Sequence, residues 1–201
     1  PNGNQGYSGR VTYDYASKYL VEFNFGYNGS ERLAAGHRFE FFPAVSAGWV
    51  ASSENFWEPI SKYINHFKIR GSYGLVGSDA FASGAPHFLY QNNIGIGSAH
   101  NFWTGLPTSE ISKKGPGFYV LAVQDAGWEH VKKFDIGFDM MLFNQLNITF
   151  DYFHDKRERI LMSRASWPSM LGYWGSKPWS NIGEVENQGF ELSLNWTKQF
   201  G

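Results

Sequence analysis

Residues 19–29 read YLVEFNFGYNG, with a large apolar side chain at nearly every second position. A period of two is typical of a β-strand whose two faces have different surroundings. The same alternation recurs along the chain and predicts seven strands, near residues 9–15, 19–27, 41–49, 67–75, 134–142, 146–152 and 190–196. The sequence therefore predicts an all-β fold built from amphipathic strands, and the question is what each face touches.

The two faces of the predicted strands differ sharply in charge. One face carries aliphatic and aromatic residues in every strand and no charged residue. All the charges fall on the other face, at Arg10, Asp14, Glu22, Lys68, Arg70, Asp135, Asp139, Asp151 and Glu191. A membrane barrel and a water-soluble β-sandwich both hide one apolar face, so the alternation alone does not choose between them.

The lengths of the connections favour a barrel. Three-residue links with the sequences ASK and FNQ alternate with long links at roughly 28–40, 76–133 and 153–189. Short turns at one end and long loops at the other are typical of an up-and-down outer-membrane barrel, whose long loops lie outside the cell. The link at 50–66 lies on the short-turn side but is longer. Its apolar spacing predicts a helical turn with Trp57, Ile60, Tyr63 and Ile64 on one face.

The facing rule also predicts the register of two hairpins. In one, Met140 and Ile148 must both point to the apolar side, which requires an odd number of loop residues and a three-residue or bulged turn. In the other, the same rule pairs Tyr15 with Tyr19 and Val11 with Phe23.

One cluster of carboxylates follows from these registers. Asp151 is expected opposite Gly137, with Asp135 and Asp139 on the diagonals. Such a cluster is able to bind a cation or, as a pair, to serve glycoside hydrolysis. A polar inner wall that faces water or protein is the simpler interpretation, because barrel lumens are normally polar.

Composition excludes several classes of protein. The 201 residues have a formal net charge of −1, which gives no basic footprint for nucleic acid, and no cysteine, which excludes disulfides and thiolate metal sites. No run approaches the roughly 20 apolar residues of a spanning helix, whereas alternating barrel strands are compatible with the mean hydropathy of −0.37. The histidines lack ligand spacing, so we predict no metal and no cofactor.

Five aromatic residues in the expected outer loops are the candidate contact sites: Trp103, Trp167, Tyr173, Trp174 and Trp179. Aromatic faces stack on sugar rings and anchor protein interfaces. Packing within the loops, or an aromatic belt at the bilayer edge, is the alternative role for the same residues.

Four segments resemble a known family. FFPAVSAGWVASSENFW, FKIRGSYGLVGSD, WEHVKKFDIGFDMMLFNQLNITFDYFHDKRERIL and NIGEVENQGFELSLNW are similar, in this order, to the barrel of SusC/RagA-type TonB-linked outer-membrane transporters of Bacteroidetes. The resemblance implies a 22-stranded antiparallel transmembrane β-barrel, of which this chain supplies about seven strands. It further implies import of glycan or peptide fragments, TonB as the energy source and a SusD-like surface lipoprotein as partner.

The resemblance also implies parts that this chain lacks. We expect residues 1–201 to be one partial barrel domain, with the signal peptide, plug, TonB box and remaining strands supplied by other segments. The opening PNGNQGYSGR has neither the charge nor the apolar stretch of a signal peptide, which is consistent with an internal piece.

Two other classes of protein remain open at this point. A secreted β-sandwich that binds carbohydrate would share the alternation and the loop aromatics, but it would dissolve without detergent. A barrel hydrolase would need a nucleophile and a base, which the spacing does not identify, so the sequence predicts no enzyme.

Overall fold

The computed structural model describes residues 3–81, 83–105, 111–164, 166, 168, 170 and 177–198. The strands are β1 (Asn4–Tyr15), β2 (Tyr19–Ser30), β3 (Phe39–Val50), β4 (Ile64–Ser78), β5 (Asn93–Thr104), β6 (Ile111–Val120), β7 (Glu129–Leu142), β8 (Leu146–Ser163) and β9 (Trp179–Trp196). Two short 3-10 helices, η1 (Ala51–Ser53) and η2 (Asn55–Ile60), lie between β3 and β4. No helix in the described ranges is long and apolar enough to cross a membrane.

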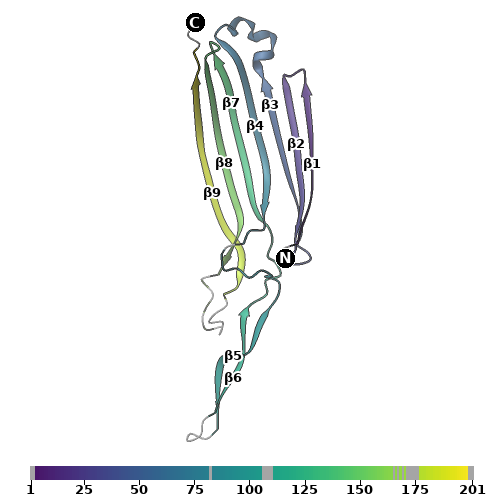
Figure 1. Cartoon of the computed structure of the whole chain (residues 1–201), viewed down its shortest axis with the longest axis vertical. Coiled ribbons are helices and arrows are strands. Elements are labelled where there is room, and N and C mark those ends of the chain that lie inside the picture. Colours follow the sequence, from purple (N-terminus) through teal and green to yellow (C-terminus); the bar gives the residue numbers. More distant parts are fainter. Residues whose placement is uncertain are drawn as a thin grey trace.

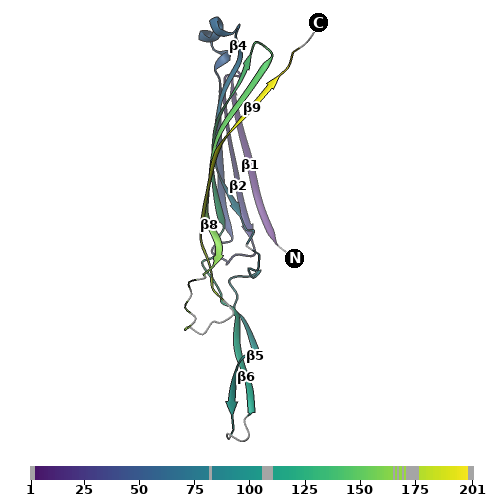
Figure 2. The same cartoon turned by 90° about the vertical axis from the view of Figure 1, so that its left-hand side faces the viewer.

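Seven strands form one sheet in the order β1-β2-β3-β4-β7-β8-β9, and every neighbouring pair is antiparallel. Figure 1 shows these strands side by side, and Figure 2 shows both edge strands, β1 and β9, curving toward the same side. The prediction of an all-β antiparallel fold is confirmed, and each of the seven predicted strands lies within a strand of this sheet.

The predicted hairpin registers are also confirmed. Met140 pairs with Ile148, Tyr15 with Tyr19, and Val11 with Phe23. Both hairpins close with three-residue turns, and the first two residues of each turn have φ near +54°. Each turn has an odd number of residues, so the two strands that it joins keep their apolar residues on the same face of the sheet.

The predicted long loop at 76–133 contains structure that the sequence did not reveal. Strands β5 and β6 pair with each other as a separate two-stranded hairpin. Both views show this hairpin extending beyond the long-loop end of the sheet (Figures 1 and 2). Its Gly, Ser and Asn content hid the strand pattern, since these residues are typical of loops.

The apolar face of the seven-stranded sheet has no covering layer in the part of the chain that the structure describes. Val11, Phe23, Val45, Ile136 and Leu192 are 41–63% exposed, although all are large and apolar. A β-sandwich would bury such a face against a second sheet. A continuous apolar surface of this size is typical of a membrane-contacting or partner-contacting face.

Aromatic residues border this apolar face at both ends of the sheet. Tyr7, Tyr27, Phe39 and Phe41 lie toward the long loops, and Tyr27 stacks on Phe39 with ring centroids 5.4 Å apart. Tyr15, Tyr19 and Trp49 lie toward the short turns. Two such belts are typical of a barrel whose aromatic rings lie at the membrane–water interfaces.

The buried core lies at the long-loop end of the sheet. It consists of Leu33, Phe42, Leu89, Ala126, Trp128 and Leu161, drawn from β3, β8 and the loops between strands. The Trp128 indole donates to the Arg38 carbonyl over 3.0 Å, so the one polar atom of this ring is satisfied. The core therefore fixes the loops to the sheet.

Candidate functional site: the polar inner wall

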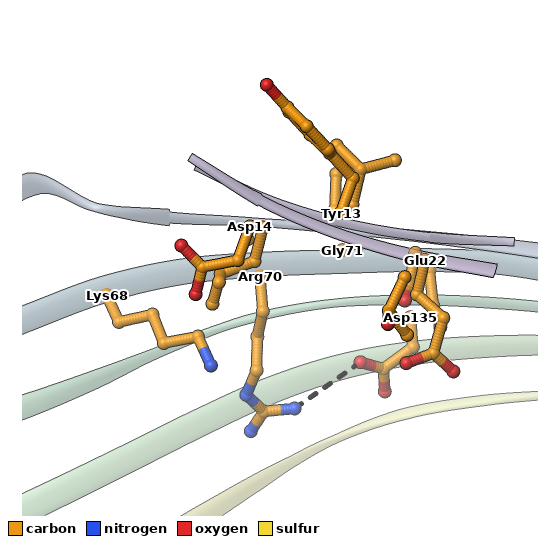
Figure 3. A pocket seen from close by; sticks show the side chains of 14 residues that line it. Tyr13, Asp14, Glu22, Lys68, Arg70, Gly71 and Asp135 are labelled. Atoms are coloured by element: carbon orange, nitrogen blue, oxygen red, sulfur yellow. Dashed lines mark ion pairs between the residues drawn. The ribbon is translucent and has the colours of Figure 1, made fainter. Parts of the chain in front are cut away.

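A hollow of 630 Å³ lies against the charged face of the sheet. The lining comes from β1, β2, β3, β4 and β7, which are successive neighbours in the sheet. Its charged side chains are Asp14, Glu22, Lys68, Arg70 and Asp135. Figure 3 shows the charged side chains gathered on one side of the ribbon, with Tyr13 pointing away from them. Alternation along each strand therefore places charge in the hollow and aromatic residues on the opposite face.

Arg70 is the centre of the charge network on this wall. Its Nε lies 3.2 Å from Asp139 Oδ2, its Nη2 lies 2.7 Å from Asp151 Oδ2, and its Nη1 lies 3.7 Å from Asp135 Oδ1. The Asp135 contact is the dashed line in Figure 3. One guanidinium on β4 thus contacts carboxylates on β7 and β8, using the several donors that only arginine presents in a fixed plane.

Gly137 makes the contact between Arg70 and Asp151 possible. Gly137 pairs with Arg70 on one side and with Asp151 on the other. A Cβ at position 137 would overlap the Asp151 carboxylate and the Phe150 carbonyl oxygen. The missing side chain therefore opens a path across β7 for the guanidinium.

The predicted placement of the carboxylates is confirmed, but Arg70 lies among them. Asp151 is opposite Gly137, and Thr149 donates to Asp139 over 3.1 Å. In the described ranges, no group of three or more His, Cys, Asp or Glu side chains is placed to hold a metal ion. Arg70 contacts all three of Asp135, Asp139 and Asp151, so these carboxylates belong to a structural ion-pair network in the wall.

Further charged pairs cover the same wall. Arg10 is ion-paired with Glu22, which also accepts a hydrogen bond from Asn24 at 2.6 Å. Lys133 lies 3.0 Å from Asp155. These pairs join neighbouring strands on the polar face, where water and the interior of a barrel both favour charge.

We expect substitution of Arg70 to destabilise the sheet through the carboxylates that remain. Arg70→Gln leaves Asp135, Asp139 and Asp151 without a cation, and we expect a loss of roughly 1–2 kcal/mol, because a side chain that is one-third exposed is partly screened by solvent. Thermal unfolding of the full-length receptor in detergent measures the effect. Adding Asp151→Asn should restore part of the loss, and equal unfolding temperatures for wild type and Arg70→Gln would contradict the assignment.

The structure describes two of the five predicted aromatic contact residues, Trp103 and Trp179. Trp103 lies on β5 and is 64% exposed. Trp179, the first residue of β9, is half-buried and packs against the core at the long-loop end. Trp167, Tyr173 and Trp174 lie outside the described residues. The two described residues therefore have different surroundings, and of these two Trp103 is the more exposed.

Two features of this site could not be read from the sequence. The pairing of β4 with β7 was hidden, because a long loop separates them and fixes no register. The role of Gly137 depends on that pairing. The alternation placed Arg70 on the charged face and so predicted the direction of its side chain. It did not predict which residues the side chain contacts.

Comparison with protein families identifies the chain. Residues 4–201 match the family model described as TonB dependent receptor-like, beta-barrel. The chain is 32% identical over 93% of its length to TonB-dependent receptor P3 of Formosa agariphila, and 25% identical over 94% of its length to TonB-dependent receptor SusC of Bacteroides thetaiotaomicron. It spans 17% and 18% of those two proteins.

Solved structures show the same fold. A structure of the RagAB peptide importer in the closed-closed state superposes with a TM-score of 0.76 at 19% identity, over 100% of this chain and 20% of that chain. The siderophore receptor PirA from Pseudomonas aeruginosa superposes with a TM-score of 0.56 at 11% identity, over 95% of this chain and 30% of that one. This chain belongs to the family of TonB dependent receptor-like β-barrels.

Proposed function

We propose that this chain is a section of the barrel wall of a SusC-like, TonB-dependent importer of nutrients. The observation that carries the proposal is the division of one seven-stranded sheet into an exposed apolar face and a charged face with a hollow. Its family consists of outer-membrane β-barrel proteins, so the apolar face contacts lipid and the charged face lines the interior.

The rest of the barrel is part of the same proposal. In the described sheet, β1 and β9 are the edge strands, and edges in hydrocarbon must be paired. Residues 1–201 would therefore be one partial barrel domain, completed by further strands and filled by a plug. The chain spans about a fifth of the RagAB chain that it matches, which leaves room for these parts in a full-length protein.

The partners and cargo follow from the relatives. A SusD-like surface lipoprotein would cover the long-loop end, and TonB would drive transport through segments outside this chain. The cargo class that we propose is oligosaccharide or peptide, since the chain resembles SusC and shares its fold with the RagAB peptide importer. We assign no catalytic step to this chain, because the clustered carboxylates are ion-paired with Arg70.

Uptake by the native bacterium tests this proposal. A strain that lacks the full-length receptor should lose uptake of one fluorescent oligosaccharide or peptide class, and plasmid-borne receptor should restore it. Loss of TonB should have the same effect, because the proposed transport needs its energy. Normal uptake of every oligosaccharide and peptide class tested, in a strain that lacks the receptor, would contradict an importer.

We expect Trp103 to contribute to contact at the outer end. Trp103→Ala should reduce uptake severalfold at unchanged surface abundance, because an exposed aromatic ring on a projecting hairpin is a typical anchor for a sugar or a protein. Trp179→Ala is the matched control. It removes a half-buried ring from the core, so its effect should appear as lower receptor stability. Unchanged uptake in Trp103→Ala would assign Trp103 no contact role.

A further inference from the structure

Five large residues form an exposed apolar cluster at the short-turn end of the sheet. We name it the aromatic collar: Phe56, Trp57, Ile60, Tyr63 and Phe143. Phe56, Tyr63 and Phe143 are 59–61% exposed, and Ile60 is 42% exposed. Four of the five come from η2 and the residues after it, and Phe143 comes from the turn between β7 and β8.

The collar lies on the lipid side of the wall. The Trp57 ring stacks on Phe67 with centroids 5.3 Å apart and planes at 7°, and Phe67 contacts Phe138 at 5.9 Å. Phe56 contacts Trp49 at 6.3 Å. Phe67, Phe138 and Trp49 belong to the apolar face of the sheet, so the collar continues that face beyond the ends of the strands. Figure 2 shows η1 and η2 leaning away from the side toward which β1 and β9 curve.

The spacing within η2 gives it two unlike sides. In a 3-10 helix, residues three apart lie above one another. Trp57 and Ile60 therefore share one row, and Phe56 and Pro59 share the apolar row beside it, whereas Glu58 and Ser61 share the polar row. The helix is short but amphipathic, and its apolar side is the one that contacts Phe67.

Polar contacts add to the stacking of Trp57 on Phe67 in holding the collar in place. Glu54 accepts from Lys18 at 3.0 Å and from Tyr19 at 2.8 Å, and these hydrogen bonds lower the pKa of Glu54. Asn65 accepts from the backbone N–H of Asn144 at 2.6 Å and donates to the Ser61 carbonyl at 3.0 Å. The segment is thus fixed to both neighbouring hairpins while its large apolar side chains stay uncovered.

Phe143 adds an independent observation. It has φ of +53°, a conformation that bulky side chains rarely adopt, and its ring meets Tyr63 edge to face at 6.1 Å. A residue such as Gly or Asn would fit this turn position with less strain. The Phe143 ring is 59% exposed beside the other exposed side chains of the collar.

We propose that the aromatic collar is an interfacial anchor that inserts into the phospholipid leaflet on the periplasmic side of the outer membrane. The short turns of such barrels face the periplasm, and aromatic side chains favour the boundary between headgroups and acyl chains. Continuity with the lipid-facing surface identifies lipid as the occupant. The anchor sets the depth of this part of the wall in the bilayer, in the way that amphipathic interfacial helices do.

Spin labels test the depth of the collar directly. The chain contains no cysteine, so Phe56→Cys and Ile60→Cys each provide one labelling site in this segment, after any cysteines elsewhere in the full-length receptor are replaced. The labelled receptor is purified from the outer membrane and placed in phospholipid nanodiscs. Collision rates with oxygen, which concentrates in lipid, are compared with those of a water-soluble nickel complex.

The proposal predicts opposite results for the two sides of η2. Labels at 56 and 60 should collide more often with oxygen than with nickel, as should a label placed at lipid-facing Ile136. A label at Glu58 should collide more often with nickel. Equal nickel exposure at 56, 58 and 60 would overturn the proposal by placing the collar in water. Low collision rates with both reagents at 56 and 60 would overturn it by showing that protein covers the collar.

Discussion

The substitution Phe138→Arg should largely abolish insertion of the full-length receptor into the outer membrane. Phe138 lies in a row of rings on the apolar face, with Phe67 at 5.9 Å and Phe150 at 5.6 Å. Arginine on the lipid face costs about 2–4 kcal/mol near the bilayer midplane. The loss of two ring contacts adds to this cost. Quantitative blotting of outer-membrane fractions measures the yield.

Two further variants test whether the loss of insertion depends on placing the change on the apolar face of the sheet. Phe23→Arg places the same charge on the apolar face of another hairpin and should impair insertion in the same way. Asp139→Asn changes a neighbouring residue on the polar face with almost no change in shape, and its yield should stay near wild type. Equal yields for all three variants would contradict the assignment of the faces.

Gly137→Val should destabilise the assembled barrel more than any other single change to the polar wall. A Cβ at this position overlaps the Asp151 carboxylate and the Phe150 carbonyl oxygen, so Arg70 loses its path to Asp151. Overpacking of this kind costs about 1–3 kcal/mol, and separation of the ion pair adds to it. A lower unfolding temperature of the detergent-solubilised full-length receptor is the expected result.

Gly71→Ala is the matched control for this prediction. Gly71 lies on the neighbouring strand, beside the residue pair of Arg70 and Gly137. A Cβ there meets only the Asp135 carbonyl oxygen at 3.6 Å, an ordinary contact. We expect almost no change in unfolding temperature for Gly71→Ala. Equal losses in Gly137→Val and Gly71→Ala would show that any added side chain disturbs this pair of strands, and that the Arg70 path has no special role.

The faces and the hairpin registers could be predicted from the sequence because both depend on local rules. A period of two fixes which residues share a face, and a three-residue turn then fixes the partner of each residue. Met140 and Ile148 illustrate this, since no distant part of the chain enters the argument. The same rules placed Asp151 opposite Gly137.

Features that depend on distant segments could not be predicted in this way. Arg70 reaches Asp151 across a strand that follows it after a long loop, and loop length does not determine register. The strands also extend past the predicted ends into regions such as Lys132, Lys156 and Glu158, where the outer face becomes charged. Beyond the membrane both faces meet water, so the alternation of apolar and polar residues ends while the hydrogen-bonded strands continue.

The link between β3 and β4 was predicted only in part. The expected helical turn exists as η1 and η2, and Trp57 and Ile60 share a side of η2. The sequence did not indicate that this turn folds onto the lipid side of the wall. That placement depends on the stacking of Trp57 on Phe67 and on the hydrogen bonds of Asn65 to its neighbours.

Purification of the full-length receptor from native membranes tests the central claim most directly. Outer membranes are solubilised in detergent, the receptor is isolated, and mass spectrometry identifies the proteins and small molecules that accompany it. The account predicts a receptor in the outer-membrane fraction, together with a surface lipoprotein and a bound oligosaccharide or peptide. A receptor that is soluble without detergent and has no membrane partner would contradict the account.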